Sequence, residues 1–187
     1  MEAFLISILA VAVSEIGDKT QLVALMLAAR FQRPVPIILG ILVATLANHT
    51  LAALAGEWVR TRVPAEYLRW GLGLSFLAVA VWALLPDRLE FKAKDLGRYG
   101  VFMTAAVAFF LAEMGDKTQV ATAMLAAKYG ALITVVAGTT LGMMIADVPA
   151  VLLGGAAAKK IPLKAVRYAA AAIFALLGVS ALAGRFG

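Results

Sequence analysis

The chain contains no cysteine, and only 15% of its 187 residues are charged. Without cysteine it can form neither a disulfide nor a thiolate metal site. With 63% hydrophobic residues and a mean hydropathy of +0.93, the chain has too few polar side chains to cover a water-soluble domain. It is therefore predicted to be an all-α membrane protein whose surroundings are the lipid bilayer.

The sequence also lacks a polar stretch long enough to form a soluble domain. The longest polar connection spans 86–99, and it is interpreted as a linker. The net charge of +6 does not indicate nucleic-acid binding, because the basic residues lie at the ends of apolar runs, as they do beside membrane spans.

Apolar runs of about 20 residues can cross the hydrocarbon core as helices. The sequence contains six such runs, which predict transmembrane helices at about 3–30, 36–59, 67–86, 100–128, 131–156 and 164–184. In the fifth run, Gly138 and Gly142 have the spacing that allows two helices to approach closely.

A motif of seven residues interrupts the first run and returns in the fourth. Residues 15–21 read EIGDKTQ and residues 113–119 read EMGDKTQ, so six of the seven positions are identical. The repeat divides the chain into a first unit at 1–86, a linker at 87–99 and a second unit at 100–187. Because three helices are an odd number, the second unit must enter the membrane from the opposite side, which predicts two inverted three-helix repeats.

The distribution of Lys and Arg predicts the orientation. Ten basic residues lie in the connections that follow the first, third and fifth predicted helices, which are all on one side of the membrane. Five lie on the opposite side of the membrane. The positive-inside rule then places the linker in the cytoplasm and both termini outside. For a bacterial protein this means a multi-pass protein of the cell (inner) membrane.

Charged side chains are costly inside a bilayer and indicate a function there. On a continuous helix Glu15 and Asp18 would share one face, as would Glu113 and Asp116. If the repeats bring the two motifs together, four carboxylates and two lysines meet with a formal charge that matches a divalent cation. With oxygen ligands and a single histidine in the chain, the site suits Mg²⁺, Ca²⁺ or Mn²⁺.

Neighbouring residues of the motif have supporting roles in this prediction. Gly17 and Gly115 could let each helix unwind locally and offer backbone carbonyls. Neutral oxygen ligands are predicted from Thr20, Gln21, Thr118 and Gln119, and charge tuning from Lys19 and Lys117. The alternative for each lysine is an ion pair with the glutamate of its own motif, four residues earlier on the same helix.

Two further ionisable residues lie within the predicted helices, His49 in the second and Asp147 in the fifth. They occupy equivalent positions in the two repeats. Each is a candidate for lining the path or relaying protons, and a packing role for His49 is equally compatible with the sequence. Crowded, desolvated carboxylates also favour bound protons, so a divalent cation would expel protons as it binds.

The duplicated Glu-x-Gly-Asp-Lys-Thr motif at 15–20 and 113–118 resembles the transmembrane-protein-165-type family of manganese and calcium transporters. The resemblance covers the whole chain. It implies a bacterial cation/proton antiporter that exports Mn²⁺ or Ca²⁺ from the cytoplasm, and the motif does not separate the two ions. No enzymatic activity and no cofactor are expected, the partners being the divalent metal ion, protons and the bilayer, with an oligomer possible.

Two other functions fit parts of the sequence. A passive cation channel would need the same acidic residues. An intramembrane aspartyl protease would use Asp18 and Asp116, but it would need neither the lysines nor the glutamates of the motif.

Overall fold

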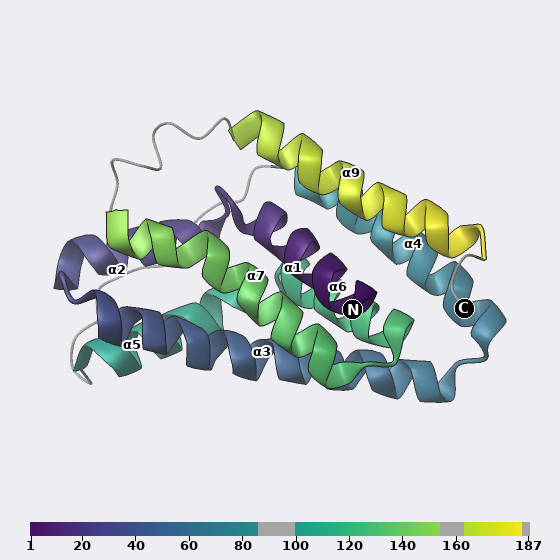
Figure 1. Ribbon diagram of the computed structural model, residues 1–187, viewed down its shortest axis with the longest axis horizontal. Coiled ribbons are helices and arrows are strands. Elements are labelled where there is room, and N and C mark those ends of the chain that lie inside the picture. The colour runs from purple at the N-terminus through teal and green to yellow at the C-terminus, as the bar shows by residue number, and fades with distance from the viewer. Residues whose placement is uncertain (86–99, 154–162, 185–187) are drawn as a thin grey trace.

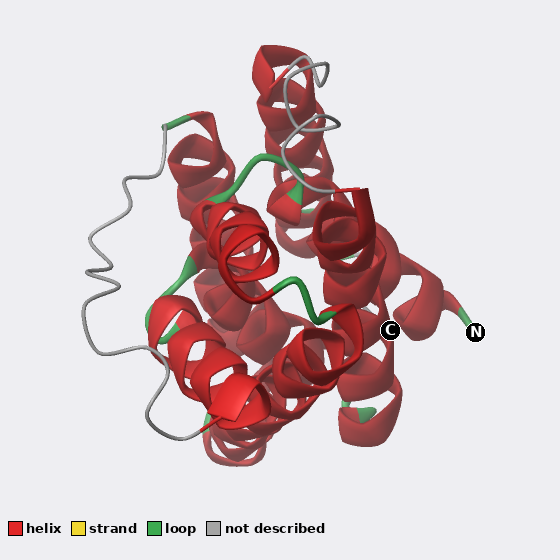
Figure 2. Ribbon diagram, turned by 90° about the vertical axis from the view of Figure 1, so that its left-hand side faces the viewer, coloured by secondary structure: helices red, strands yellow, loops and turns green. Residues whose placement is uncertain are grey.

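The computed structural model describes residues 1–85, 100–153 and 163–184, so the predicted linker at 87–99 lies outside the described residues. Helices joined by short loops make up this part of the chain, which contains no strand (Figures 1 and 2). The helices are α1 (Glu2–Glu15), α2 (Lys19–Phe31), α3 (Pro34–Arg62), α4 (Ala65–Leu84), α5 (Gly100–Glu113), α6 (Lys117–Tyr129), α7 (Leu132–Leu153) and α9 (Leu163–Leu182). The all-α prediction is confirmed.

Four of the described helices, α3, α4, α7 and α9, are long and apolar enough to cross a membrane. They correspond to four of the six predicted spans and differ from them by at most a few residues at the described ends. The prediction of continuous helices at 3–30 and 100–128 is wrong, because each of these segments consists of two shorter helices, α1 with α2 and α5 with α6.

The backbone of the motif explains both breaks. Gly17 and Gly115 adopt left-handed conformations, with φ of 80° and 75°, which side chains with a Cβ rarely tolerate. Asp18 and Asp116 then cap the N-termini of α2 and α6, each accepting a hydrogen bond from a backbone N–H of the new helix. The i,i+3 arrangement expected for Glu15 and Asp18 is therefore absent, since Glu15 ends one helix and Asp18 precedes the next.

The broken helices pack against the long ones in the middle of the molecule. Helix α1 lies along α7, α5 lies along α3, and α3 and α7 contact each other. Helices α4 and α9 form a pair at one side, visible along the upper edge of Figure 1. The acidic residues that flank the two breaks are thereby buried, while Met114 and Gly115 of the second break lie at the surface.

Glycines bring these helix pairs into close contact. A Cβ on Gly40 of α3 would lie 2.7 Å from the carbonyl oxygen of Phe102 on α5. A Cβ on Gly138 of α7 would lie 2.8 Å from the carbonyl oxygen of Phe4 on α1. The close approach predicted for Gly138 and Gly142 is confirmed, and Gly40 makes the equivalent contact in the first half of the chain.

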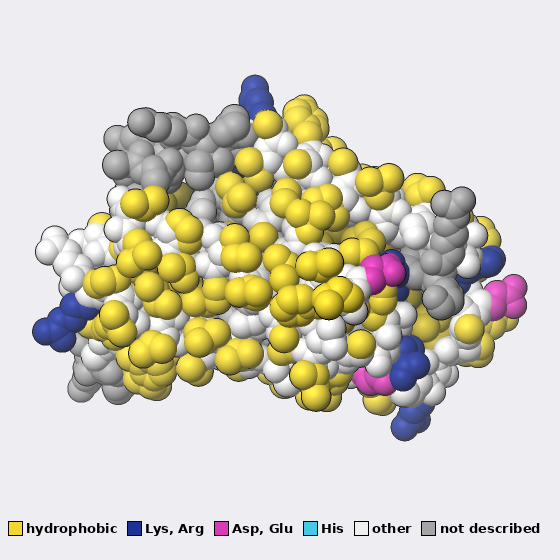
Figure 3. All heavy atoms as spheres, viewed as in Figure 1, with side chains coloured by type: hydrophobic (Ala, Val, Ile, Leu, Met, Phe, Trp, Pro, Cys, Tyr) yellow, Lys and Arg dark blue, Asp and Glu magenta, His cyan; other side chains and the backbone are white. Residues whose placement is uncertain are grey.

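Large apolar side chains cover the outside of the bundle. Leu5, Leu51, Leu74 and Leu176 on four different helices are each more than half exposed. Figure 3 shows a continuous apolar surface over the middle of the molecule, with charged side chains gathered toward its ends. Such a surface is stable against lipid and not against water, which supports a multi-pass membrane protein.

Candidate metal centre

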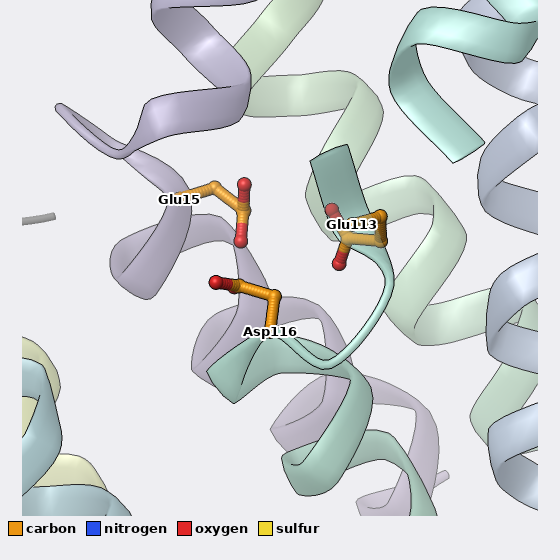
Figure 4. Close-up of side chains that lie close together, drawn as sticks. All are labelled: Glu15, Glu113 and Asp116. Carbon is orange, nitrogen blue, oxygen red and sulfur yellow. The ribbon is translucent and has the colours of Figure 1, made fainter. Parts of the chain in front are cut away.

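The two helix breaks place the acidic residues of the motif in the interior. Glu15 is the last residue of α1 and Glu113 the last residue of α5, and both are buried. Asp116, at the start of α6, is also buried. One carboxylate oxygen from each of these three residues lies within 4.8 Å of the others, and Figure 4 shows the three side chains directed toward one another. Three of the four predicted ligands therefore converge, and they come from both copies of the motif.

The fourth predicted ligand, Asp18, lies in a different environment. Its carboxylate accepts a hydrogen bond from the backbone N–H of Lys19 at 2.7 Å and pairs with the Lys117 ammonium at 3.0 Å. Asp116 has the corresponding partner, because the Lys19 ammonium lies 2.8 Å from one of its oxygens. Each lysine thus pairs with the aspartate of the other motif and not with the glutamate of its own.

These crossed pairs change the charge balance of the site. The two lysines neutralise the two aspartates, while in the described structure Glu15 and Glu113 have no lysine or arginine partner. Buried carboxylates that form no ion pair with a lysine or arginine are costly unless they bind a proton or a metal ion. The excess negative charge therefore resides on the glutamates.

Threonine hydroxyls fix the orientation of both glutamates. Thr20 donates a hydrogen bond to Glu15, and Thr118 donates one to Glu113 at 2.5 Å. The remaining oxygen of each carboxylate, Oε1 of Glu15 and Oε2 of Glu113, is buried without a hydrogen-bond partner within the described residues. Carboxylates held in this way by an outer layer of donors are typical of metal sites.

The glutamines stabilise the breaks themselves. The side-chain oxygen of Gln21 accepts a hydrogen bond from the Gly17 N–H, and that of Gln119 accepts one from the Gly115 N–H, both at 2.8 Å. These oxygens were predicted as neutral ligands. In this structure each is used by the backbone of its own motif.

His49 and Asp147 both lie beside Glu113. The Nε2 atom of His49 is 3.7 Å from Oε1 of Glu113, which is too long for a hydrogen bond but close enough for an electrostatic interaction. Asp147 is completely buried, and neither of its oxygens has a hydrogen-bond partner in the part of the chain that the structure describes. It lies close enough to Glu113 for the two carboxylates to repel each other. Both residues therefore interact electrostatically with Glu113 of the cluster.

Sequence reasoning assigned no role to Asn48, which is completely buried. Its side-chain nitrogen donates to the Phe110 carbonyl oxygen at 3.0 Å, so it attaches α3 to α5 one turn before Glu113. In a comparable contact, the Gln21 nitrogen donates to the Ala146 carbonyl oxygen at 3.1 Å, beside Asp147. The sequence did contain a sign of this role, because an amide side chain within an otherwise apolar helix needs a hydrogen-bond partner there.

Such a site can bind a hard divalent cation. Carboxylate oxygens are the ligands that Ca²⁺, Mg²⁺ and Mn²⁺ prefer, and the two glutamates supply the opposite charge. Buried in a bundle with an apolar surface, this cluster defines the class of protein as a membrane carrier or channel for cations.

The chain belongs to the family described as divalent cation/proton antiporter GDT1, whose sequence model matches residues 3–91 and 101–187. This is a family of transporters and not of enzymes. The family resemblance inferred from the duplicated motif is thereby confirmed, and so is the assignment as a cation/proton antiporter.

Individual relatives extend over nearly the whole chain. It is 48% identical over 181 residues to a protein of Vibrio cholerae named "Putative manganese exporter", covering 96% of this chain and 90% of the relative. It is 31% identical over 200 residues to "GDT1-like protein sll0615" of Synechocystis, covering 96% of each. A rice protein, "GDT1-like protein 3", is 28% identical over 208 residues, which cover 96% of this chain and 73% of that protein. No solved structure matches the chain.

Proposed function

We propose that this protein exports Mn²⁺ from the cytoplasm in exchange for protons. The observation that carries the proposal is the convergence of Glu15, Glu113 and Asp116, whose oxygens come from both copies of the motif. The name of the Vibrio relative supports Mn²⁺ as the transported ion. Ca²⁺ has the same ligand preference and is the second candidate substrate.

The proposed ligands have distinct roles. Glu15 and Glu113 supply the charge that the cation neutralises, and Asp116 completes the group of oxygens within 4.8 Å. Asp18, paired with Lys117, joins the site when that ion pair opens. Thr20 and Thr118 orient the glutamates.

Exchange with protons follows from the same charges. Carboxylates that are crowded together in a buried site favour bound protons when no metal ion is present, and Glu15 and Asp147 are both completely buried. They hold protons, which a divalent cation displaces when it binds. The site then carries metal in one direction and protons in the other, with His49 and Asp147 as the residues that pass protons to and from Glu113.

The proposed transport architecture counts each broken helix pair as one membrane crossing. With α3, α4, α7 and α9, this gives six crossings in two inverted three-helix repeats. The reciprocal pairs Lys19 with Asp116 and Lys117 with Asp18 support a two-fold relation between the motifs. So do the equivalent contacts of Gly40 and Gly138. Inverted repeats are the usual basis of alternating access.

For the orientation, we propose that the linker at 87–99 lies in the cytoplasm and both termini outside the inner membrane, as the basic residues indicate. The chain has no cysteine, so single cysteines can be introduced at Ala93 and Gly187 without further changes. An impermeant thiol reagent added to intact spheroplasts should label the cysteine at position 187 and not the one at position 93. The reverse pattern would invert the proposed direction of transport.

The proposal is tested by reconstitution. Proteoliposomes should accumulate Mn²⁺ against its gradient when a pH gradient is imposed, and each divalent cation that enters should be accompanied by alkalinisation of the lumen. Ca²⁺ and Mg²⁺ are measured in the same way to rank the substrates. Glu113→Gln serves as the inactive control.

A passive channel would equilibrate Mn²⁺ and never concentrate it, so uphill transport separates the two functions. For an aspartyl protease, two carboxylates must share a proton. Asp18 and Asp116 are instead each paired with a lysine, so the geometry of the site does not favour proteolysis.

A further inference from the structure

A second polar site lies at the end of the bundle, away from the acidic cluster. The end of α3, the start of α4 and the ends of α6 and α9 surround a cavity of about 580 Å³. Its charged lining residues are Arg60, Arg69, Lys128 and Glu66, three basic groups against one acid. Even when Glu57, the ion-pair partner of Arg60, is counted, the basic groups outnumber the acids, so the cavity favours an anion over the cation that the family transports.

Arg69 is the residue best placed to bind that anion. Its Nε atom is buried and has no hydrogen-bond partner within the described residues. Its guanidinium group lies 5.6 Å from the centre of the Trp70 ring, which restricts its orientation. Arg60, in contrast, already makes two hydrogen bonds to Glu57, at 2.5 Å and 2.8 Å. A planar guanidinium group with an unused donor fits the oxygens of a phosphate.

An apolar groove continues from this cavity. It has a volume of about 350 Å³, lies between α3, α4 and α6, and shares four lining residues with the basic cavity, namely Val63, Leu68, Leu72 and Ala127. Its remaining lining is mostly apolar and includes Gly71, where an added Cβ would meet nothing within 4 Å. The groove thus offers room for a hydrocarbon chain next to a site for an anion.

The position of the two spaces matches the layers of a bilayer. Trp58, Tyr67 and Trp70 are 61%, 70% and 49% exposed near the cavity, and such aromatic side chains typically lie at the membrane interface. Charged side chains gather at this end of the molecule in Figure 3. The basic cavity is then at the depth of lipid headgroups, and the groove extends toward the depth of acyl chains.

We propose that the joined cavity and groove bind one anionic phospholipid. Its phosphate contacts Arg69 and its acyl chain occupies the groove beside Gly71. A zwitterionic lipid would bring its own cationic group into a cavity lined by three basic residues, and a free phosphate ion would leave the groove unused. The charge and the shape together therefore select an anionic amphiphile.

Native mass spectrometry of the full chain in detergent tests this proposal. After delipidation, phosphatidylglycerol and phosphatidylcholine with identical acyl chains are titrated separately. One phosphatidylglycerol per chain should be retained at a concentration about tenfold lower than phosphatidylcholine. Equal retention of the two lipids would overturn the proposal, and so would complete displacement of phosphatidylglycerol by an equimolar concentration of inorganic phosphate, which would assign the cavity to a free anion.

Variants separate the headgroup from the chain. Arg69→Gln should lower phosphatidylglycerol retention about tenfold. Arg69→Lys should recover part of this loss, because lysine keeps the positive charge but cannot donate the two parallel hydrogen bonds of a planar guanidinium group. Gly71→Phe should lower the retention of phosphatidylglycerol by filling the groove. Arg62→Gln, an exposed arginine that does not line the cavity, and Val81→Phe on the exposed face of α4 are the matched controls.

Unchanged retention in both Arg69→Gln and Gly71→Phe would refute the lipid site, as would an equal loss in Arg62→Gln. Size-exclusion chromatography verifies that each variant is folded. If Arg69→Gln aggregates, Gly71→Phe decides the outcome alone, because its added side chain begins in open space. The readout is independent of metal transport, so the lipid site and the proposed antiport fail or succeed separately.

Discussion

Lys19 and Asp116 lie 2.8 Å apart although they belong to different copies of the motif. Lys117 and Asp18 form the reciprocal pair at 3.0 Å. Two ion pairs therefore connect the helix breaks to each other, and they involve the lysines and aspartates of the motif and not its glutamates. The predictions below follow from this division of roles.

The two lysines should differ in their contribution to stability. The Lys117 side chain is 4% exposed and that of Lys19 is 23% exposed, while both aspartate side chains are fully buried, so water can take the place of Lys19 more readily than that of Lys117. We expect Lys117→Met to destabilise the protein by about 3–5 kcal/mol, the range for breaking a buried ion pair, and Lys19→Met by less. Thermal unfolding in detergent measures both. Equal losses, or a larger loss for Lys19→Met, would contradict the difference in burial.

Neutralising either glutamate should abolish transport while the protein still inserts. Glu15→Gln and Glu113→Gln each keep the size of the side chain and remove one of the two charges without a lysine or arginine partner. We expect Mn²⁺ affinity to fall at least about a hundredfold, measured by isothermal titration on purified protein. Glu2→Gln, at an exposed acid on the same helix as Glu15, is the control. Wild-type affinity in both glutamate variants would remove these residues from the site.

Thr118 tests the orientation of Glu113 without removing a charge. Thr118→Val deletes the hydroxyl that lies within hydrogen-bond distance of both Glu113 and Asp116, and loss of such an outer contact typically costs about 10–100-fold in metal affinity. Thr139→Val is a matched control, because the buried Thr139 hydroxyl donates to the Val136 carbonyl of its own helix and, among the described residues, to no acidic side chain. A comparable loss of affinity in both variants would indicate a general effect of packing.

Metal affinity should increase with pH. Protons and Mn²⁺ compete for the same buried oxygens, so lowering the proton concentration removes the competitor. Titration of Mn²⁺ binding between about pH 5.5 and pH 8.5, where buried carboxylates exchange protons, should show tighter binding at the higher pH. An affinity independent of pH over this range would leave a channel or uniporter as the better explanation.

The close helix contacts predict opposite effects of alanine at two glycines. Gly40→Ala places a methyl group 2.7 Å from a backbone oxygen of α5 and should destabilise the protein by about 1–3 kcal/mol. Gly71→Ala has open space around its Cβ and should stabilise α4 by about 0.5–1 kcal/mol. The free energy of unfolding of each variant is measured by chemical unfolding in mixed micelles and compared with that of the unmodified protein. Loss of stability in both variants would show that the backbone of α4 requires glycine for another reason.

Much of the candidate site could be predicted from the sequence. The duplicated motif identified the acidic residues, and it singled out Gly17 and Gly115 as points where the helices could unwind. The prediction of Glu15 and Asp18 on one helical face was wrong, because it assumed that the helix continues through a glycine. A residue with φ near 80° cannot belong to a right-handed helix, and hydropathy does not report that angle.

The sequence by itself determined that the protein is a membrane protein, that it contains two copies of one motif, and that the side chains of its candidate site carry oxygen atoms. Composition and repetition express these properties directly, since they depend on which residues are present and in what order. Only the tertiary structure decided that Lys19 pairs with Asp116, that Asn48 attaches to the Phe110 carbonyl, and that Arg69 faces a cavity. Those contacts join residues far apart in the chain, and they exist because close helix packing at positions such as Gly40 and Gly138 brings the segments together.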